Sequence, residues 1–343
     1  MKAGKLSESV LKRSVLKQLH MKTDTQAVKP GVGNDFGAVN LVSGENLVTA
    51  VATRLLCTDS TQAFSVYAAL NNLACSGAEP LGVTINLLIP PVMNEQQLRN
   101  LVQAVDEICL KEQVPVMAGH TESVRSVTEP ILTVTALGTT DTDILTNARI
   151  CPGMDILVTK WIALEGTVVL AGEYETELKK RFAQPFLDRA KSFAKYLSIR
   201  SEAAVAAQSG AVALHDLSES GIYGALWEMG QCSGVGLEID LKKIPVRQET
   251  VEICEYFDLN PYKLLSAGSL LIAAEDGSAV AAKLAKAGIP AAVIGKATDS
   301  NDRVLINGEE RRFLETAQTD ELWKMGGCYE RKNLNLYREK QPG

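Results

Sequence analysis

Apolar residues along the chain fall into two alternating patterns. Residues 5–20 place leucines and valines three and four positions apart, which predicts a helix with one apolar face. Glu95 to Lys111 repeats this spacing and predicts a second amphipathic helix. Short apolar runs such as Leu47 to Ala52 and Leu81 to Ile89 have the length of buried strands. Strands therefore alternate with helices, which indicates a mixed α/β protein.

A turn at Cys151-Pro152-Gly153 interrupts this alternation and is the predicted domain boundary. Strand and helix patterns resume after it, from Asp155 onward. The chain of 343 residues is too long for one ordinary core and suits two domains. We predict an N-terminal helix and lead-in over 1–29, one α/β domain over 30–150, a second over 151–330 and a polar tail over 331–343.

Charge and composition narrow the possible partners. The net charge is −6 and the isoelectric point is about 5.4, so a nucleic-acid partner is not expected from bulk charge. No run reaches the roughly 18 apolar residues of a membrane span, and the first residues lack the apolar core of a signal peptide. We therefore expect a cytoplasmic protein without a membrane partner. The seven cysteines form no C-x-x-C pair and are expected to be reduced and packed.

The first candidate for chemistry is the glycine-rich loop around Gly31, Gly33, Asn34 and Asp35. Glycines let backbone N–H groups approach an anion, and Asp35 could hold a magnesium ion against phosphate oxygens. The loop has neither the Walker A nor the Rossmann spacing. Taken alone, it is explained more simply as a turn before a strand.

Two further polar segments follow predicted strands, where ligands collect in α/β sheets. Gly119-His120-Thr121-Glu122 offers an imidazole, a hydroxyl and a carboxylate for phosphate or metal contacts, with a polar turn as the alternative. Lys160 could neutralise phosphate or be a solvated strand end.

The segment His215-Asp216-Leu217-Ser218-Glu219 also follows a strand and opens a helix. Two acids and an imidazole converge there, and we name His215, Asp216 and Glu219 as candidate catalytic residues. The alternative is a simple helix cap, with Ser218 or Ser220 as the capping residue. A serine hydrolase is disfavoured because no G-x-S-x-G elbow exists.

In chain order, these segments resemble the superfamily of aminoimidazole ribonucleotide synthetase (PurM), HypE, thiamine-monophosphate kinase (ThiL) and selenophosphate synthetase (SelD). They are most similar to its HypE-like, AIR synthase-related branch, over about residues 30 to 325. Ala118 to Glu122 is similar to G-G-H-T-E, Thr159 to Thr167 to T-K-x-x-x-x-E-G-T, and His215 to Gly221 to H-D-x-T-E-G-G. Any one of these motifs is weak, but the ordered series is specific.

The resemblance implies a PurM-like fold of two domains, whose N-terminal sheet pairs with its mate in a homodimer. It also implies ATP in the cleft between domains, with Mg²⁺ joining the phosphates to aspartates. Active members phosphorylate a substrate or activate an amide oxygen. The implied metal ligands are Asp35 and Glu122. The implied ATP and phosphate contacts are Gly31, Gly33, Asn34, Asp35, Asn72, Gly119, His120, Thr121, Glu122 and Lys160.

The sequence departs from this family pattern in its acids. Asn34, Ala52 and Asn72 stand where members often carry carboxylates, and Asp59 lies near the lost positions. We expect weaker binding of the metal–triphosphate, because an amide is only a neutral ligand for Mg²⁺. HypE proper ends in a reactive cysteine, whereas this sequence ends in Gly343, so dehydration of a group on its own tail is disfavoured.

Two functional hypotheses follow from the sequence. The first is an ATP- and magnesium-dependent enzyme, of synthetase or kinase type, that acts on an unidentified small molecule. The second is a catalytically degenerate nucleotide-binding dimer that serves as a sensor or as the partner of a maturation protein.

Overall fold

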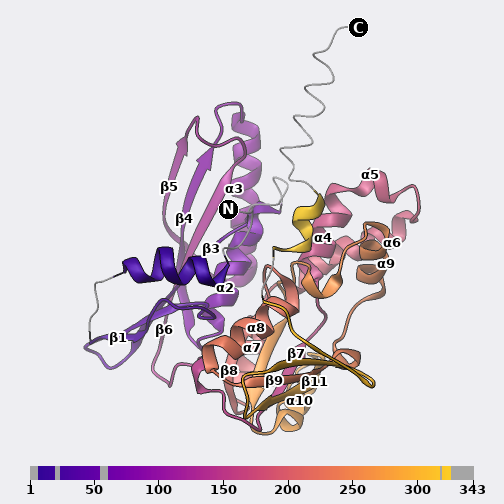
Figure 1. Ribbon diagram of the computed structural model, residues 1–343. Helices are drawn as coiled ribbons and strands as arrows, with labels where there is room; N and C mark the ends of the chain where they lie inside the picture. The colour runs from indigo at the N-terminus through magenta and orange to yellow at the C-terminus, as the bar shows by residue number, and fades with distance from the viewer. Residues whose placement is uncertain (1–6, 20–23, 55–60, 317–318, 326–343) are drawn as a thin grey trace.

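The computed structural model describes residues 7–19, 24–54, 61–316 and 319–325, and these form two β-sheets with helices packed on them (Figure 1). The first sheet has six strands in the order β1-β2-β3-β6-β4-β5, and the second has seven in the order β13-β12-β9-β11-β7-β10-β8. The predicted mixed α/β class is confirmed. The sheets share no strand, and the chain passes from one to the other between Thr140 and Asp155, an interval that contains the Cys151–Gly153 turn.

The first sheet is mainly antiparallel, and only its β4–β5 pair is parallel. In β3, buried and exposed residues alternate, so Val48, Ala50 and Ala52 face helix α2 while Val51 is exposed. Helix α3 begins at a capping box in which Asn94 and Gln97 exchange hydrogen bonds. The elements are β1 (Gln26–Val28), β2 (Gly37–Asn40), β3 (Asn46–Thr53), α2 (Ser65–Ala74), β4 (Glu79–Ile89), α3 (Glu95–Glu112), β5 (Val116–Ser123) and β6 (Ile131–Thr140).

The second sheet is antiparallel except for the β12–β9 pair. Its strand β10 is buried at every position, so the core of this half lies around it. The helices are α4 (Leu164–Glu173), α5 (Glu175–Leu178), α6 (Gln184–Lys191), α7 (Arg200–Ala207), α8 (Gly221–Ser233), α9 (Gln248–Tyr256) and α10 (Gly277–Lys286). The strands are β7 (Asp155–Thr159), β8 (Ala211–Asp216), β9 (Gly236–Asp240), β10 (Leu270–Ala274), β11 (Ala291–Thr298), β12 (Arg303–Asn307) and β13 (Glu310–Phe313).

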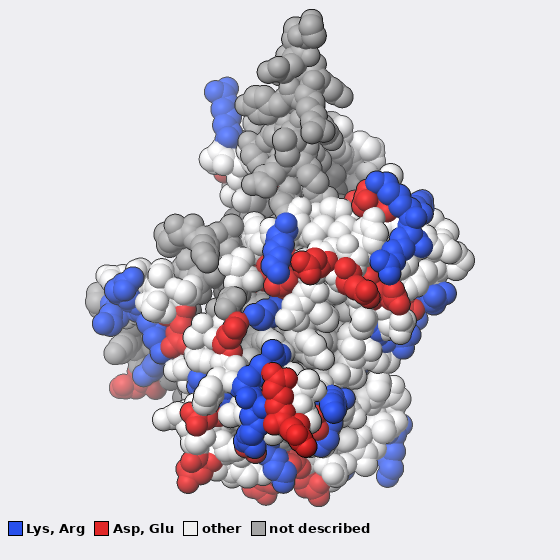
Figure 2. All heavy atoms as spheres, turned by 45° about the vertical axis from the view of Figure 1, so that its right-hand side comes forward, with Lys and Arg blue, Asp and Glu red and all other residues white. Residues whose placement is uncertain are grey.

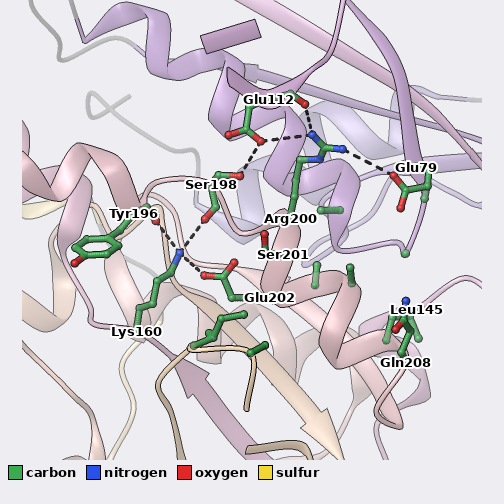
Figure 3. Close-up of a pocket in the computed structure, with 18 of the residues that line it drawn as sticks. Glu79, Glu112, Leu145, Lys160, Tyr196, Ser198, Arg200, Ser201, Glu202 and Gln208 are labelled. Carbon is green, nitrogen blue, oxygen red and sulfur yellow. Dashed lines mark hydrogen bonds and ion pairs between the residues drawn. The ribbon is translucent and has the colours of Figure 1, made fainter. Parts of the chain in front are cut away.

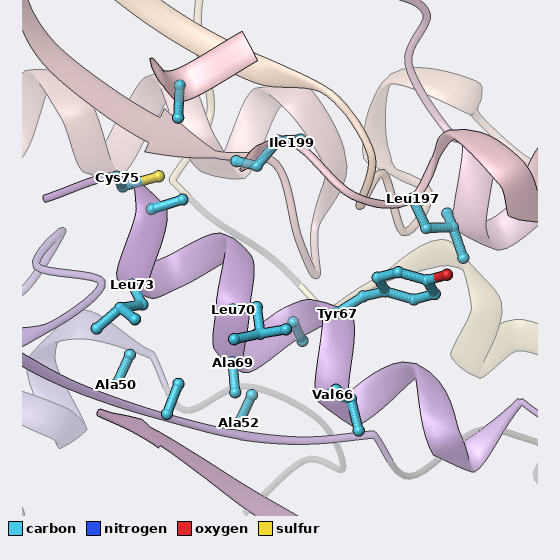
Figure 4. Close-up of a cluster of buried hydrophobic side chains, with 14 of the residues drawn as sticks. Ala50, Ala52, Val66, Tyr67, Ala69, Leu70, Leu73, Cys75, Leu197 and Ile199 are labelled. Carbon is cyan, nitrogen blue, oxygen red and sulfur yellow. The ribbon is translucent and has the colours of Figure 1, made fainter. Parts of the chain in front are cut away.

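Helix α2 joins the two halves. Its buried face packs on β3 through Leu70 and Leu73, while its other side meets Leu197 and Ile199 of the second half (Figure 4). The Asn71 side chain donates to the Leu197 carbonyl at 2.9 Å and accepts from the Ile199 N–H at 3.1 Å. Both asparagine hydrogen bonds are buried, and they connect the two halves by pairing backbone groups of the second half with a side chain of the first.

The N-terminal helix differs from its prediction. Over the described part of 5–20, a single α-turn (α1, Glu8–Val10) runs into a π-helical turn (Leu11–Val15) and a 3₁₀ turn (Leu16–Gln18). None of these residues is fully buried, and Leu19 is about half exposed. The apolar face predicted from the spacing therefore lacks the tertiary packing that regularises most helices.

The described surface carries mixed charge on the face that Figure 2 shows, where lysines and arginines lie among aspartates and glutamates. No charge of one sign dominates that face. No helix in the described ranges is both long and apolar enough to span a bilayer.

Candidate functional site

A cavity of about 620 Å³ lies where the two halves meet. The glycine-rich loop, helix α2, the loop after β8, helix α8 and the N-terminal helical segment all contribute to its lining. Two glycines permit this assembly. A Cβ on Gly33 would lie 2.4 Å from the Glu228 carbonyl oxygen, and one on Gly221 would lie 2.5 Å from the Tyr262 carbonyl oxygen. Both glycines also have positive φ, so their conformations are strained for other residues.

His215 lies directly beneath the cavity and is almost fully buried. Its Nδ1 is 2.7 Å from the Asp35 carboxylate, and its Nε2 is 3.4 Å from that of Glu228. Burial by itself lowers the pKa of His215, but the two carboxylates outweigh burial and raise that pKa to about 10. The imidazole is therefore charged at neutral pH and acts as a counter-ion that fixes Asp35.

Asn147 completes the support of the glycine-rich loop. Its Nδ2 donates to the Gly33 carbonyl at 3.0 Å and lies 3.0 Å from His215 Nδ1. This asparagine belongs to a short 3₁₀ turn, Asn147–Arg149, in the connection between the sheets. No sequence motif marked Asn147, because its importance comes from where the connection crosses the site.

Asp216 ends β8 and is buried against α2. With its amide nitrogen facing inward, Asn72 donates to the two Asp216 carboxylate oxygens at 2.8 and 3.2 Å. Asp35, Cys75 and Asp216 each place a ligand atom within 4.8 Å of the others. Burial, followed by the two aspartate charges, raises the pKa of the Cys75 thiol well above its usual value, so Cys75 stays protonated. The anionic oxygen donors at this point are therefore Asp35 and Asp216.

Glu219 lines the cavity beside a buried ion pair that sequence reasoning missed. Arg54 Nε lies 3.0 Å from Glu165 Oε1, so the pair joins the end of β3 to the first turn of α4. Burial lowers the pKa of Arg54, whereas Glu165, Glu219 and Asp216 together raise it above its ordinary value. This fixed positive charge lies in the region where the family pattern suggested another acid.

Asp320 holds the loop that precedes α8. Its carboxylate accepts from the Ser220 N–H at 2.7 Å and from the Leu322 N–H at 2.9 Å. Burial raises the pKa of Asp320 to about 7 against these hydrogen bonds, and the Glu219 charge adds to the rise. Ser220 takes a left-handed conformation and makes no side-chain cap, so the serine cap considered from the sequence is replaced by an aspartate 100 residues later.

Several predicted site residues do not meet at this cavity. Gly119, His120, Thr121 and Glu122 lie within strand β5, at the sheet edge, and all four are exposed. The predicted strand ended before this motif, whereas the structure continues it to Ser123. His120 Nε2 lies 3.3 Å from Glu122 Oε2, and neither residue lines the cavity.

Lys160 is also placed elsewhere. It is buried in an ion pair with Glu202 and donates to the carbonyls of Tyr196 at 2.7 Å and Ser198 at 2.8 Å (Figure 3). It lines a second cavity, which shares no lining residue with the first. The solvated strand end considered from the sequence is thus wrong, and within this chain Lys160 does not reach the loop of Asp35.

The remaining sequence candidates lie at the first cavity. Gly31, Gly33, Asn34, Asp35, Asn72, Asp216 and Glu219 all line it. Asn34 is held by the protein itself, because its Nδ2 donates to the Lys29 carbonyl at 3.0 Å and its Oδ1 accepts from Cys232 Sγ at 3.2 Å. Ala52 is buried in the sheet. Asp59 lies outside the described residues.

One wall of the cavity comes from the N-terminal helical segment. Trp227 Nε1 donates to Glu8 Oε2 at 3.1 Å, and the Arg303 guanidinium lies 4.4 Å from the centre of the Trp227 ring. Lys12 pairs with Glu8 at 2.5 Å. The segment therefore contacts helix α8 through polar side chains rather than through its leucines.

The two halves of the chain match the two domains of one protein family. Residues 33–140 match the N-terminal domain of AIR synthase related proteins, and residues 152–307 match their C-terminal domain. The chain belongs to the AIR synthase related family. The resemblance read from the motifs is thereby confirmed.

Individual relatives agree with this assignment. A putative hydrogenase expression/formation protein of Methanocaldococcus jannaschii is 24% identical over 322 residues, which cover 88% of this chain and 91% of the relative. The carbamoyl dehydratase HypE of Cupriavidus necator is 25% identical over 266 residues, covering 74% and 72%.

Solved structures show the same fold at low identity. ThiL complexed with AMPPCP and TMP is 16% identical with a TM-score of 0.71, covering 94% of this chain and 98% of that one. HypE in complex with ATP is 16% identical with a TM-score of 0.69, covering 94% and 97%. The PurM-like two-domain fold is thus established for this chain.

Proposed function

We propose that this protein binds ATP with Mg²⁺ in the 620 Å³ cavity and uses it to phosphorylate a small molecule or to activate an amide oxygen. The observation that carries the proposal is the convergence of Asp35 and Asp216, from the two halves of the chain, beside a glycine-rich loop. Membership of the AIR synthase related family supports it, as do the ATP and AMPPCP complexes of HypE and ThiL.

The donor set suits a magnesium ion. Mg²⁺ is commonly held by one or two carboxylates, with waters and substrate phosphates completing its shell. Asp35 and Asp216 would hold the ion, which would offset phosphate charge when bound. Glu122, the second metal ligand expected from the sequence, lies on exposed strand β5, and Asp216 takes its place in the proposal.

The other residues of the site have distinct tasks in this proposal. The backbone N–H groups of Gly31 and Gly33 would approach phosphate oxygens. In this proposal charged His215 holds Asp35 in place, so we assign it a positioning role where the sequence named it a candidate catalytic residue. Asp216 and Glu219 face the cavity from the loop before α8 and would line the substrate side.

A specific observation favours the alternative, a nucleotide-binding dimer without turnover. Asn72, where family members often carry an acid, donates to Asp216 and so adds no negative charge. Arg54 adds a fixed positive charge near Asp216. Both features lower the attraction of the site for a divalent cation. Such a protein would serve as a sensor or maturation partner, and one HypE neighbour was solved as a HypE–HypF complex.

We further propose a homodimer formed through strand β5. All eight residues of this edge strand are exposed, including Val116 and Met117, whose exposed fractions are 41% and 47%. An exposed, partly apolar edge is a template for pairing with another strand. A second copy would cover it and bring His120 and Glu122 to the interface. Light scattering should then report twice the 36.9 kDa chain mass, and Met117→Lys should reduce it to the mass of one chain.

Calorimetric titration with ATP tests the central proposal. We expect binding that is at least about tenfold tighter with Mg²⁺ than with EDTA, and loss of this difference in Asp35→Asn and Asp216→Asn. Asp106→Asn, an exposed acid on α3, is the matched control. Absence of heat and of any thermal shift at millimolar ATP would refute nucleotide binding. Measurable ATP turnover that disappears in Asp216→Asn would instead exclude the degenerate alternative.

A further inference from the structure

A second cavity of the described structure, about 1260 Å³, lies outside the cleft discussed so far. Residues of both halves line it, from the ends of α2 and α3 to helix α7 and the turn before β11 (Figure 3). Its volume matches or exceeds the roughly 300–1,000 Å³ of typical small-molecule sites. Of the residues to which the resemblance assigns ATP or phosphate contacts, Lys160 alone lines this cavity, and the proposed function does not use it.

A connected set of buried polar groups shapes one wall of this cavity. Lys160 pairs with Glu202 and holds the carbonyls of Tyr196 and Ser198. The Ser198 hydroxyl donates to Glu112 at 2.9 Å, and Figure 3 shows how these groups face one another across the two halves. The wall is therefore fixed before any ligand arrives, which lowers the entropic cost of binding.

The uncompensated charge in the cavity is positive. Five cationic side chains and four carboxylates line it, a net charge of +1: Glu202 pairs with Lys160, Asp143 pairs with Arg149, and Glu112 and Glu79 share Arg200. Among the described residues, Lys111 and Lys195 line the cavity without a carboxylate partner, and Lys111 donates to the Tyr67 hydroxyl at 3.1 Å. Burial lowers the pKa of Lys160 most, Glu202 and Glu112 oppose this, and the charge of Lys111 adds to the lowering. An anionic ligand group is favoured here.

An aromatic surface lies beside Lys195. Lys195 Nζ is 4.8 Å from the centre of the Tyr196 ring, and Tyr196 meets Trp161 edge-on at 5.4 Å between centroids. The lining of the same cavity also includes small residues such as Ala204 and Gly288, which leave space within it. A planar ring can pack on such a surface while its anionic substituent reaches Lys195.

From this geometry we propose a second ligand site, for a small organic anion that carries a planar ring. Tyr196 and Trp161 contact the ring, and Lys195 and Lys111 contact the anionic group. The site does not depend on the proposed ATP chemistry. Helix α2 separates it from the cleft: Ala74 lines this cavity and Asn72, two residues away, lines the other. Two residues along a helix are about 200° apart, so they point to opposite sides.

The test uses three probes: 2-naphthoate, its neutral isostere 2-naphthamide, and acetate. By saturation-transfer NMR and calorimetry, we expect 2-naphthoate to bind at least about tenfold more tightly than the other two, because only it combines ring and charge. Lys111→Gln/Lys195→Gln should weaken 2-naphthoate about tenfold. The control Lys242→Gln/Lys243→Gln removes the same charge from an exposed 3₁₀ turn outside the cavity and should not.

Two tryptophan variants locate the probe. Ala204→Trp fills the second cavity from an exposed position and should abolish binding, whereas Ser218→Trp fills the cleft and should leave binding unchanged. The reverse result places the probe in the cleft and overturns the proposal. So does equal binding of 2-naphthamide, or no binding of 2-naphthoate at millimolar concentration. If Ala204→Trp fails to fold, the lysine pair and its control decide the question.

Discussion

The ion pair between His215 and Asp35 makes the stability of this protein depend on pH in a defined way. The folded-state pKa of His215 is about 10, and the value for the unfolded chain is close to 6.5. Because the folded pKa is raised, the stabilisation is fully present below pH 6.5 and is lost as pH rises toward 10. The difference between these two pKa values corresponds to a stabilisation on the order of 5 kcal/mol.

The sharpest window is pH 7.5 to 8.5. There the folded protein holds one proton on His215 that the unfolded chain has released, so the free energy of unfolding should fall by about 1.4 kcal/mol per pH unit. Asp320, with a pKa of about 7, has by then largely completed its own titration. Asp35→Asn removes the nearer carboxylate, so burial should lower the pKa of His215 and flatten this slope.

Urea unfolding at pH 7.5, 8.0 and 8.5, followed by tryptophan fluorescence, measures these slopes. Asp106→Asn serves as control, because it removes an exposed acid from α3 and should keep the wild-type slope. Cysteine ionisation in the unfolded chain contributes equally to all three proteins and cancels in the comparison. A wild-type free energy that stays constant over this range, or an equal slope in Asp35→Asn, would refute the charged state assigned to His215.

Three further predictions concern packing and the metal. Gly33→Ala should lower the free energy of unfolding by about 2 kcal/mol more than Gly44→Ala, because both glycines have positive φ but only Gly33 faces a backbone atom at 2.4 Å; urea titration compares them. Asn71→Ala should cost about 2–3 kcal/mol by the same assay, because it leaves the buried groups of Leu197 and Ile199 unpaired, and a loss below 0.5 kcal/mol would contradict this. Asn72→Asp should destabilise the metal-free protein because the new carboxylate repels Asp216, and Mg²⁺ should reverse this loss of stability. Melting curves with and without Mg²⁺ test this. A Mg²⁺ effect no larger than in wild type would count against the metal site.

The sequence predicted those parts of the site whose geometry is local. The loop from His215 to Gly221 follows a strand and opens a helix, and its position at the cavity depends mainly on that local succession. The glycine-rich loop was also predicted from a local pattern. A glycine is needed at position 33 because the backbone lies against Glu228, in addition to any contact with a phosphate.

The misplaced residues depended on sheet order, which no local pattern contains. The strand patterns near Lys160 and His120 were recognised, but they do not show where each strand lies in its sheet. Strand β5, which contains His120, is the outer edge of the first sheet. The end of β7, which precedes Lys160, faces the second cavity. The Arg54–Glu165 pair was missed because its members are 111 residues apart: Glu165 was noted only as part of the Thr159–Thr167 motif, and Arg54 alone resembles an ordinary charged residue. Asn147 and Asp320 act through backbone groups of distant loops, for which no residue spacing gives a signal.

Asn71 and Asn72 are neighbours on α2, and their tasks differ: one ties the halves together and the other faces the acids of the cleft. A hinge at this point would break two buried hydrogen bonds, so opening the cleft by moving α2 away from the second half is energetically costly. The wall formed by residues 7–12 is held instead by the side chains of Glu8 and Trp227. We therefore expect a ligand to enter past the N-terminal helical segment, with the hydrogen bond between Glu8 and Trp227 as one contact that opposes its entry and release.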